Sequence, residues 1–425
     1  MSSAASGGEK LGFQATWSMA VGGMVGGGIF STLGVVIGIS GRLAWLSFLV
    51  AGTIALLAGY SYAHLARRFG EGGGAFTFLR EIHEEGFAGN LAWILIIGYV
   101  LTNAVYAFTF GEYANHVLGL GPLGARAAAV TILLVFIGVN LLGTGEAGGV
   151  EVFLVWFKLA VLVGLAGLGI ARWNPSLLSQ GVPDAGVPDA IFGAAAVFMA
   201  YEGFQLLTYD YDDIRDADRT LPRAVLSAIA VVILVYMAVA VGTAMLIGAD
   251  QIVQNQEVAL SIAGQQAFGT AGLVVVTIAA AFSTGSAINA TLFATARLSH
   301  SVASAGELPR VVEHRNREGV PDRAVITLGL LAAVFASIGS LSSLVESASL
   351  AFLFTFAVVC GVAFREKVGA RVLTGAGALG AGAATVALVV RLASTAPVAL
   401  GLFAGIVVLV LVGRPLVLRH LDTDG

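Results

Sequence analysis

The first long apolar segment carries a dense run of glycines, Val21-Gly22-Gly23-Met24-Val25-Gly26-Gly27-Gly28-Ile29-Phe30. Five glycines fall within the seven residues 22–28. Each interior glycine destabilises a helix by about 0.5–1 kcal/mol relative to alanine, so helix stability does not explain the run. One interpretation is a helix that unwinds in the membrane, where its free N–H and C=O groups bind a small charged molecule. The alternative is close packing against neighbouring helices.

The composition is that of an integral membrane protein. Hydrophobic residues make up 57% of the 425 residues, charged residues make up 11%, and the mean hydropathy is +0.90. Soluble domains carry about 25% charged residues. The single cysteine, Cys360, excludes an intrachain disulfide. We therefore expect the lipid bilayer as the surroundings of the chain and no nucleic-acid partner.

Twelve apolar segments are long enough to cross a bilayer, which takes about 20 residues each. They lie at 14–39, 43–66, 88–118, 125–143, 150–171, 189–209, 223–248, 270–302, 324–341, 345–364, 371–391 and 396–416. The connections between them are short, so no separate soluble domain is expected. The sequence predicts an all-α membrane protein of 12 transmembrane helices, with residues 1–425 forming a single transmembrane domain.

The positions of Lys and Arg predict the orientation of these spans. Seventeen of the 22 Lys and Arg residues fall in segments on the side of the N-terminus. Only Arg42, Arg126, Arg172 and Arg391 fall on the opposite side, and Lys158 lies within a span. Because cytoplasmic loops are enriched in positive residues, we expect both termini in the cytoplasm. We expect the chain itself to lie in the plasma membrane.

The sixth span also contains residues that do not suit a regular apolar helix. Glu202, Gly203 and Gln205 interrupt the apolar stretch around 197–205. An ionisable group inside a membrane is costly and usually faces a cavity or a partner. The alternative is that Glu202 lies near the end of the span and extends its carboxylate to the membrane surface.

Two interrupted spans, the first and the sixth, predict an inverted repeat. When corresponding spans of two halves are both broken, five spans apart, a five-plus-five architecture with broken helices 1 and 6 is expected. The first repeat would cover residues 12–171 and the second residues 189–364. Two extra C-terminal helices, helices 11 and 12, would occupy residues 371–416.

Several motifs, taken in order, resemble those of the amino acid–polyamine–organocation (APC) transporter superfamily. They are Gly26–Phe30, Phe69–Phe76, Ala200–Phe204, the acidic and basic loop Asp212–Val225, and the segment from Asn289 to Pro321. Some positions depart from the family pattern. Glycine replaces serine in the first motif, the usual proline is missing from the second, and Asp-Ala replaces Asn-Pro in the loop.

This resemblance implies a substrate site at the two interrupted spans. Members of the family hold the substrate carboxylate on main-chain amides. The resemblance assigns this role to the amides of Gly27 and Gly28. The substrate ammonium would meet carbonyl groups of Met24, Met199 and Glu202. Tyr106 either closes this pocket or forms a hydrogen bond between helices. The substrate-binding residues expected from the resemblance are Met24, Gly26, Gly27, Gly28, Ile29, Tyr106, Met199, Tyr201 and Glu202.

Lys158 is the expected proton-coupling residue. It lies near the middle of the fifth span, seven residues or about 10 Å of helix beyond Glu151. Lys158 resembles a fifth-span lysine that proton-coupled members of the family carry where related transporters bind sodium. A buried amine can bind and release a proton. The alternative is a structural cation that faces the carbonyl groups of the first span.

Sodium coupling is the competing interpretation. Ser283 and Thr284 belong to a hydroxyl cluster in the eighth span, the element that supplies sodium ligands in related folds. Such hydroxyls often bond only to their own helix backbone.

The remaining function classes lack their signatures. The sequence has no H-E-x-x-H motif, no nucleophile elbow and no ATP-binding Gly-Lys motif, and its six histidines are scattered. No repeated filter sequence of a channel is found. We expect a secondary active transporter of amino acids or related small amines, coupled to protons, with no catalytic residues, cofactor or bound metal. A sodium-coupled or uncoupled exchanger of the same fold is the alternative.

Overall fold

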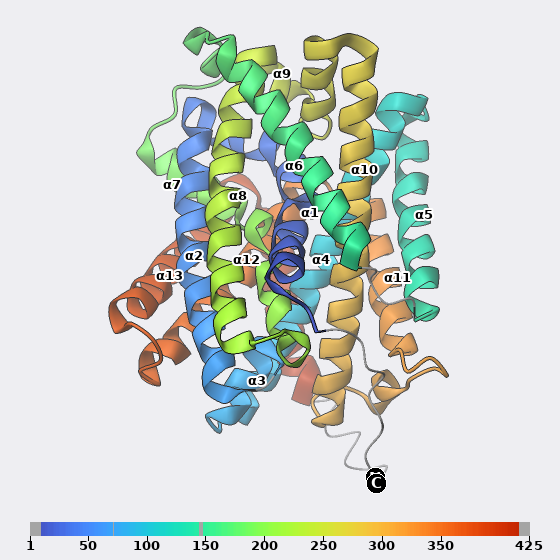
Figure 1. Cartoon of the computed structure of the whole chain (residues 1–425), viewed down its shortest axis with the longest axis vertical. Helices are drawn as coiled ribbons and strands as arrows, with labels where there is room; N and C mark the ends of the chain where they lie inside the picture. The colour runs from blue at the N-terminus through green and yellow to red at the C-terminus, as the bar shows by residue number, and fades with distance from the viewer. Residues whose placement is uncertain (1–9, 71, 144–147, 416–425) are drawn as a thin grey trace.

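The computed structural model describes residues 10–70, 72–143 and 148–415, and these residues are almost entirely helical (Figure 1). Within this part of the chain the β-type pairing is an isolated bridge between Leu11 and Ile214. The prediction of an all-α membrane protein is therefore confirmed. Predictions for Glu71, for Arg419 and for the end of the twelfth span at residue 416 lie outside the described residues.

The first half of the chain forms six α-helices and two short 3-10 turns. They are α1 (Phe13–Ser40), η1 (Gly41–Leu43), α2 (Ala44–Phe69), α3 (Gly74–Glu81), α4 (Glu85–Leu118), α5 (Gly121–Leu141), α6 (Gly148–Ala171) and η2 (Pro175–Leu178).

The second half begins with a segmented region and continues in long helices. Its elements are α7 (Val187–Ala196), η3 (Phe198–Tyr201), η4 (Phe204–Thr208), η5 (Tyr211–Asp213), α8 (Ala217–Ile247), α9 (Ala249–Gln254), α10 (Ala259–Ser304), η6 (Arg310–Glu313), α11 (Asp322–Ile338), α12 (Leu341–Arg365), α13 (Arg371–Thr395), α14 (Pro397–Val408) and η7 (Leu409–Gly413).

Every predicted span coincides with a helical segment. Among the described residues, eight stretches are both long and apolar enough to cross a membrane, and one of them, Phe13–Phe69, joins α1 to α2. The sixth, ninth and twelfth predicted spans correspond to shorter helices, of which α7 has 10 residues and α11 has 17. The chain is a multi-pass membrane protein, whereas the count of twelve spans and the five-plus-five repeat remain predictions.

The predicted break in the first span is absent. α1 is one continuous helix from Phe13 to Ser40, with the glycine run in its middle. Neighbouring groups occupy the space that a side chain at these positions would need, so glycine is required here for packing. A Cβ at Gly26 would lie 2.6 Å from the Cβ of Ala287, and a Cβ at Gly27 would overlap the ring of Tyr106. The glycines thus serve close helix packing, the alternative interpretation of the run.

The predicted break in the sixth span is present. α7 ends at Ala196, and the chain continues through η3 and η4 with Glu202 and Gly203 between them. Glu202 is extended (φ −67°, ψ 149°) and Gly203 has φ 124°. A positive φ of this size strongly favours glycine, so Gly203 sets the position of the break.

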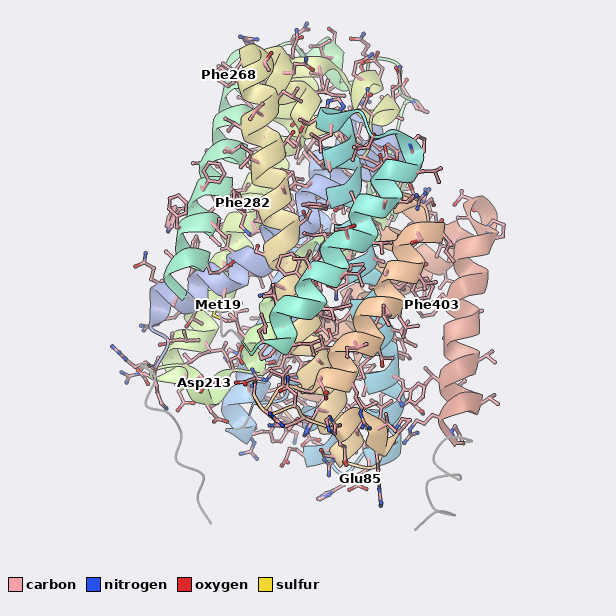
Figure 2. All side chains as sticks on the ribbon, turned by 90° about the vertical axis from the view of Figure 1, so that its right-hand side faces the viewer. Met19, Glu85, Asp213, Phe268, Phe282 and Phe403 are labelled. Atoms are coloured by element: carbon pink, nitrogen blue, oxygen red, sulfur yellow. The ribbon has the colours of Figure 1, made fainter. Side chains whose placement is uncertain are left out.

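α1 and the break lie at the centre of the helix bundle. α2 and α8 pack along each other on one side, and α4 packs against α5 and α10 on the other. α6, the green helix in Figure 1, crosses diagonally between these two groups. Figure 2 shows Phe403 of α14 on a helix at the outer edge. α14 and η7 lead to Arg414, whose guanidinium bonds Glu307 and Asn90.

Candidate substrate and coupling site

A cavity of about 390 Å³ extends from one end of the bundle toward the central break. Its mouth contains the exposed residues Lys10 and Asp213, and its inner end contains Gly22, Gly23 and Gly203. Figure 2 shows Met19 and Asp213, two of the lining residues, on the same side of the molecule. The other lining residues are Leu11, Ala15, Glu151, Leu206, Leu207, Tyr209, Asp210, Ser286, Ala287, Ala290, Phe293, Ala294 and Arg297.

The substrate-binding residues expected from the resemblance lie directly beyond this inner end. All of them are buried, and none belongs to the cavity wall. The ring of Tyr106 lies against Gly27, and its hydroxyl donates a hydrogen bond to Glu202 Oε2 (3.2 Å). Tyr106, which belongs to α4, therefore links this helix to α1 and to the break. Its ring fills the space between α4 and the glycine run.

Glu202 is held inside the protein and does not extend to the membrane surface. Its side chain is 1% exposed. Gln205 donates to Glu202 Oε1 (3.1 Å) and to the Tyr99 hydroxyl (3.1 Å), while its own oxygen accepts from the Gly203 amide (2.9 Å). The carboxylate and the break are therefore fixed by side chains of α4 and of the sixth span itself.

Three helices direct polar side chains at main-chain carbonyl groups of the glycine run. Lys158 Nζ on α6 donates to the Gly22 carbonyl (3.3 Å), and Ser283 on α10 donates to the Val25 carbonyl (2.8 Å). Tyr236 on α8 donates to the carbonyl of Met24 (2.7 Å) and lies near that of Ala200 (3.0 Å). The carbonyl face of α1 is thus the point where cationic and hydroxyl donors converge.

Two residues that stabilise the break were missed by the sequence interpretation. The Ser349 hydroxyl on α12 donates to the Ala196 carbonyl (2.8 Å) and accepts from the Met199 amide (3.0 Å), so it bridges the interrupted helix. Tyr236 was the more visible signal, because a lone tyrosine in the apolar run of α8 needs a partner for its hydroxyl. Ser349 has several serines around it on α12, and nothing local distinguishes it.

The hydroxyl cluster of α10 is already hydrogen-bonded. Thr284 donates to the Ala280 carbonyl of its own helix (2.8 Å), while Ser283 bonds across to α1. Within the described ranges, the side chains of His, Cys, Asp and Glu form no group of three or more that could hold a metal ion.

An ion pair and two main-chain bonds lie at the mouth of the cavity. Arg297 Nη1 lies 2.7 Å from Asp210 Oδ1. Burial raises the pKa of the Asp210 carboxyl above its ordinary value, and Arg297 partly offsets this effect. The Leu11 amide donates to the Asp213 carbonyl (2.8 Å), and the Arg215 amide donates to the Leu11 carbonyl (2.9 Å). Leu11, two residues before the start of α1, is therefore attached to the loop after the break.

The apolar helical bundle, its central break and the cavity that ends on the break fit a membrane transporter. The sequence model of the amino acid permease family matches residues 11–417, and the chain belongs to this family.

Relatives with known names cover most of the chain. Inner membrane transport protein YbaT of Escherichia coli is 30% identical over 85% of this chain and 84% of its own length. The serine/threonine exchanger SteT of Bacillus subtilis is 24% identical over 71% of this chain and 69% of its own. The methylthioribose transporter of Bacillus subtilis is 26% identical over 82% of this chain and 79% of its own.

Proposed function

We propose that the chain is a secondary active transporter of amino acids or related small amines, and that protons drive it through Lys158. The observation that carries this proposal is the position of Lys158. Lys158 is 2% exposed, and its amine donates to the carbonyl of Gly22, at the inner end of the cavity. A titratable cation on the glycine run can respond to both the substrate and the proton, which is what coupling requires.

The proposed substrate site consists of the glycine run and the break. The amides of Gly27 and Gly28 would receive the carboxylate, and the carbonyls of Met24, Met199 and Glu202 would receive the ammonium. In this structure α1 is a continuous helix and the ring of Tyr106 covers Gly27, so substrate binding would need α1 to unwind at the glycine run as well as Tyr106 to move away. Main-chain groups read the amino acid backbone only, and serine and threonine are the first side chains to test because a relative is named as their exchanger.

Alternating access would move α1, α2, the α7–η4 segment and α8 against α4, α5, α10 and α11. The packing supports this division, because α2 packs along α8 and α4 packs along α10. The excess of Lys and Arg at the end that includes Lys10 and Arg67 supports a cavity mouth on the cytoplasmic side. The protein would then lie in the plasma membrane with both termini inside and open inward in this conformation.

Sodium coupling is the second candidate, and the bond between Ser283 and Val25 favours it. A hydroxyl and a carbonyl oxygen 2.8 Å apart would both turn toward a bound Na⁺. Thr284 bonds to its own helix, and the Lys158 ammonium already lies on the same face of α1. These two facts make proton coupling the better supported of the two.

Uptake into proteoliposomes tests the proposal. Labelled serine, threonine and other amino acids are supplied under an inward pH gradient, with and without sodium, to the wild type, Lys158→Ala and the exposed-loop control Lys367→Ala. We expect uptake that the pH gradient drives, that ignores sodium, and that Lys158→Ala alone abolishes. Uptake that requires sodium, or that keeps its pH dependence in Lys158→Ala, would show that Lys158 has a structural role.

A further inference from the structure

Lys158 has no direct access to the cavity. It is buried and does not belong to the cavity wall, although the cavity reaches Gly22, the residue whose carbonyl it bonds. A proton that reaches Lys158 from this side therefore needs a carrier at the inner end of the cavity.

Glu151 lies at that position. It is partly exposed and lines the cavity, and its carboxylate lies so close to Gly22 that a Cβ on this glycine would overlap Oε1. Glu151 and Lys158 thus contact the same residue of α1, the former at its α-carbon and the latter at its carbonyl oxygen. When both are ionised, the two side chains carry opposite charges and attract each other.

The geometry of α6 favours an approach of the two side chains. Seven residues correspond to nearly two helical turns, which puts Glu151 and Lys158 on the same face, about 10 Å apart along the axis. Helical side chains point toward the N-terminus of their helix, so Lys158 extends toward Glu151. The long lysine chain spans much of the separation.

The other charged groups near Glu151 are few. α1 carries no charged residue, and Lys10 lies just before it. α10 contributes Arg297, which is paired with Asp210, and the loop after the break contributes Asp213 and the phenol of Tyr209. The charged residues of α8, which are Asp218, Arg219 and Arg223, do not line the cavity.

We propose that Glu151 carries protons between the cavity and Lys158, a role that rests on the proposed proton-coupled transport. The Glu151 carboxylate takes a proton from water in the cavity and becomes a neutral acid. It then gives this proton to the neutral amine of Lys158, which becomes an ammonium, and Glu151 returns to the carboxylate. In this proposal Glu151 acts on the proton, and other groups, those of Met24, Gly27, Gly28, Met199 and Glu202, hold the amino acid.

Gly22 makes this arrangement possible. A methyl group on residue 22 would displace the Glu151 carboxylate and would lie 3.2 Å from Val155 Cγ2. Gly22→Ala should therefore disturb proton delivery without removing either titratable group, and it provides a second variant for the test.

The test separates proton delivery from transport. Wild type, Glu151→Gln, Glu151→Asp, Gly22→Ala and the control Glu112→Gln, a half-buried carboxylate on α4, are reconstituted with a trapped pH-sensitive dye. Serine exchange without a gradient and serine-driven proton entry are measured across a pH series. We expect Glu151→Gln to keep serine exchange. Its rate of serine-driven proton entry should fall by about tenfold or more, which is within the range of typical coupling energies. The pH dependence of this rate should also change. Glu151→Asp should restore part of the proton entry.

An unchanged pH profile and unchanged proton entry in Glu151→Gln would overturn the role of Glu151. If Lys158→Ala still loses coupling in that case, proton-coupled transport itself stands. If the wild type moves no protons with any amino acid of the panel, the proposed coupling fails together with the role of Glu151. Loss of exchange in Glu151→Gln, with a monodisperse protein, would also overturn the role, because it would assign Glu151 to the transport movement.

Discussion

α1 and the sixth span both place glycines at the centre of the bundle, yet only the sixth span breaks. In α1, five glycines lie within one continuous helix, whereas in the sixth span a single glycine with φ 124° accompanies the break. The two segments touch, because a Cβ at Gly203 would lie 2.5 Å from the carbonyl carbon of Gly23. Glycine content therefore does not distinguish a broken helix from a closely packed one.

The difference lies in what replaces the main-chain hydrogen bonds. At the sixth-span break, Ser349 bonds the Ala196 carbonyl and the Met199 amide, and Gln205 bonds the Gly203 amide. In α1 the helix keeps its own bonds, and outside donors such as Tyr236 add a second bond to its carbonyl groups. A break in a membrane is stable where specific side chains bond the freed backbone groups.

Gly203→Ala should have the largest effect on stability. Alanine adopts φ 124° poorly, which costs about 1–3 kcal/mol, and its methyl group would overlap Gly23, which costs about 1–3 kcal/mol more. Gly27→Ala incurs only the cost of steric overlap, with Tyr106, so its free energy of unfolding should fall by about half as much. Cys360 is the single cysteine and is buried, so a thiol-reactive dye reports thermal unfolding in detergent.

The control for these two variants is Gly138→Ala in α5, where a Cβ has no neighbour within 4 Å. Equal losses in Gly203→Ala and Gly27→Ala would mean that the strained backbone of the break contributes nothing.

Ser349→Ala should destabilise the protein by about 1–3 kcal/mol for each backbone group it leaves without a partner. Ser347→Ala on the same helix is the matched control, because the buried Ser347 hydroxyl has no hydrogen-bond partner among the described residues. The two unfolding temperatures are compared with that of the wild type. If both variants behave alike, Ser349 does not hold the break.

Tyr236→Phe should have a smaller effect, about 1 kcal/mol, because it removes one hydroxyl and keeps the ring. This hydroxyl joins α8 to the Met24 carbonyl on α1, next to the Ala200 carbonyl of the break. Tyr113→Phe is the control, since the Tyr113 hydroxyl is buried and finds no hydrogen-bond partner within the part of the chain that the structure describes. Hydrogen exchange of the α1 amides, compared between the variants, would reveal a locally looser helix in Tyr236→Phe only.

Asp210→Asn should have the smallest effect, a gain of less than about 1 kcal/mol at neutral pH. Because burial raises the pKa of Asp210 in the folded protein, the folded state favours the protonated acid, and this contribution is lost as pH rises through the folded pKa. Asparagine cannot ionise and avoids that loss. Unfolding temperatures measured over a pH series should converge below the ordinary aspartate pKa, and a difference that grows in acid contradicts the prediction.

The fold was largely predictable because apolar length and periodicity are local properties. All twelve predicted ranges coincide with helical segments, and the break at Glu202 and Gly203 follows from their chemistry. The state of α1 was not predictable in this way. It depends on Tyr106 and Ala287, which lie far along the chain and fill the space beside the glycines.

The buried position of a polar residue was predictable where that residue is conspicuous in its own span. Lys158 and Glu202 are charged residues in apolar segments, and both lie buried beside the glycine run or the break. The cavity-facing position of Glu151 and the bridge made by Ser349 depend on how helices cross. No spacing along the sequence encodes those crossings.

The pairing between Leu11 and the loop around Ile214 supplies a built-in reference for distance measurements. Two main-chain bonds join chain segments about two hundred residues apart, and both segments belong to the proposed moving group. Spin labels on Lys10 and Asp212 should therefore keep one separation throughout the cycle. Labels on Lys10 and on Ser301, at the end of α10, should give a distribution that shifts as substrate is added. The constant distance between Lys10 and Asp212 would then serve as the internal reference for the changing distance between Lys10 and Ser301.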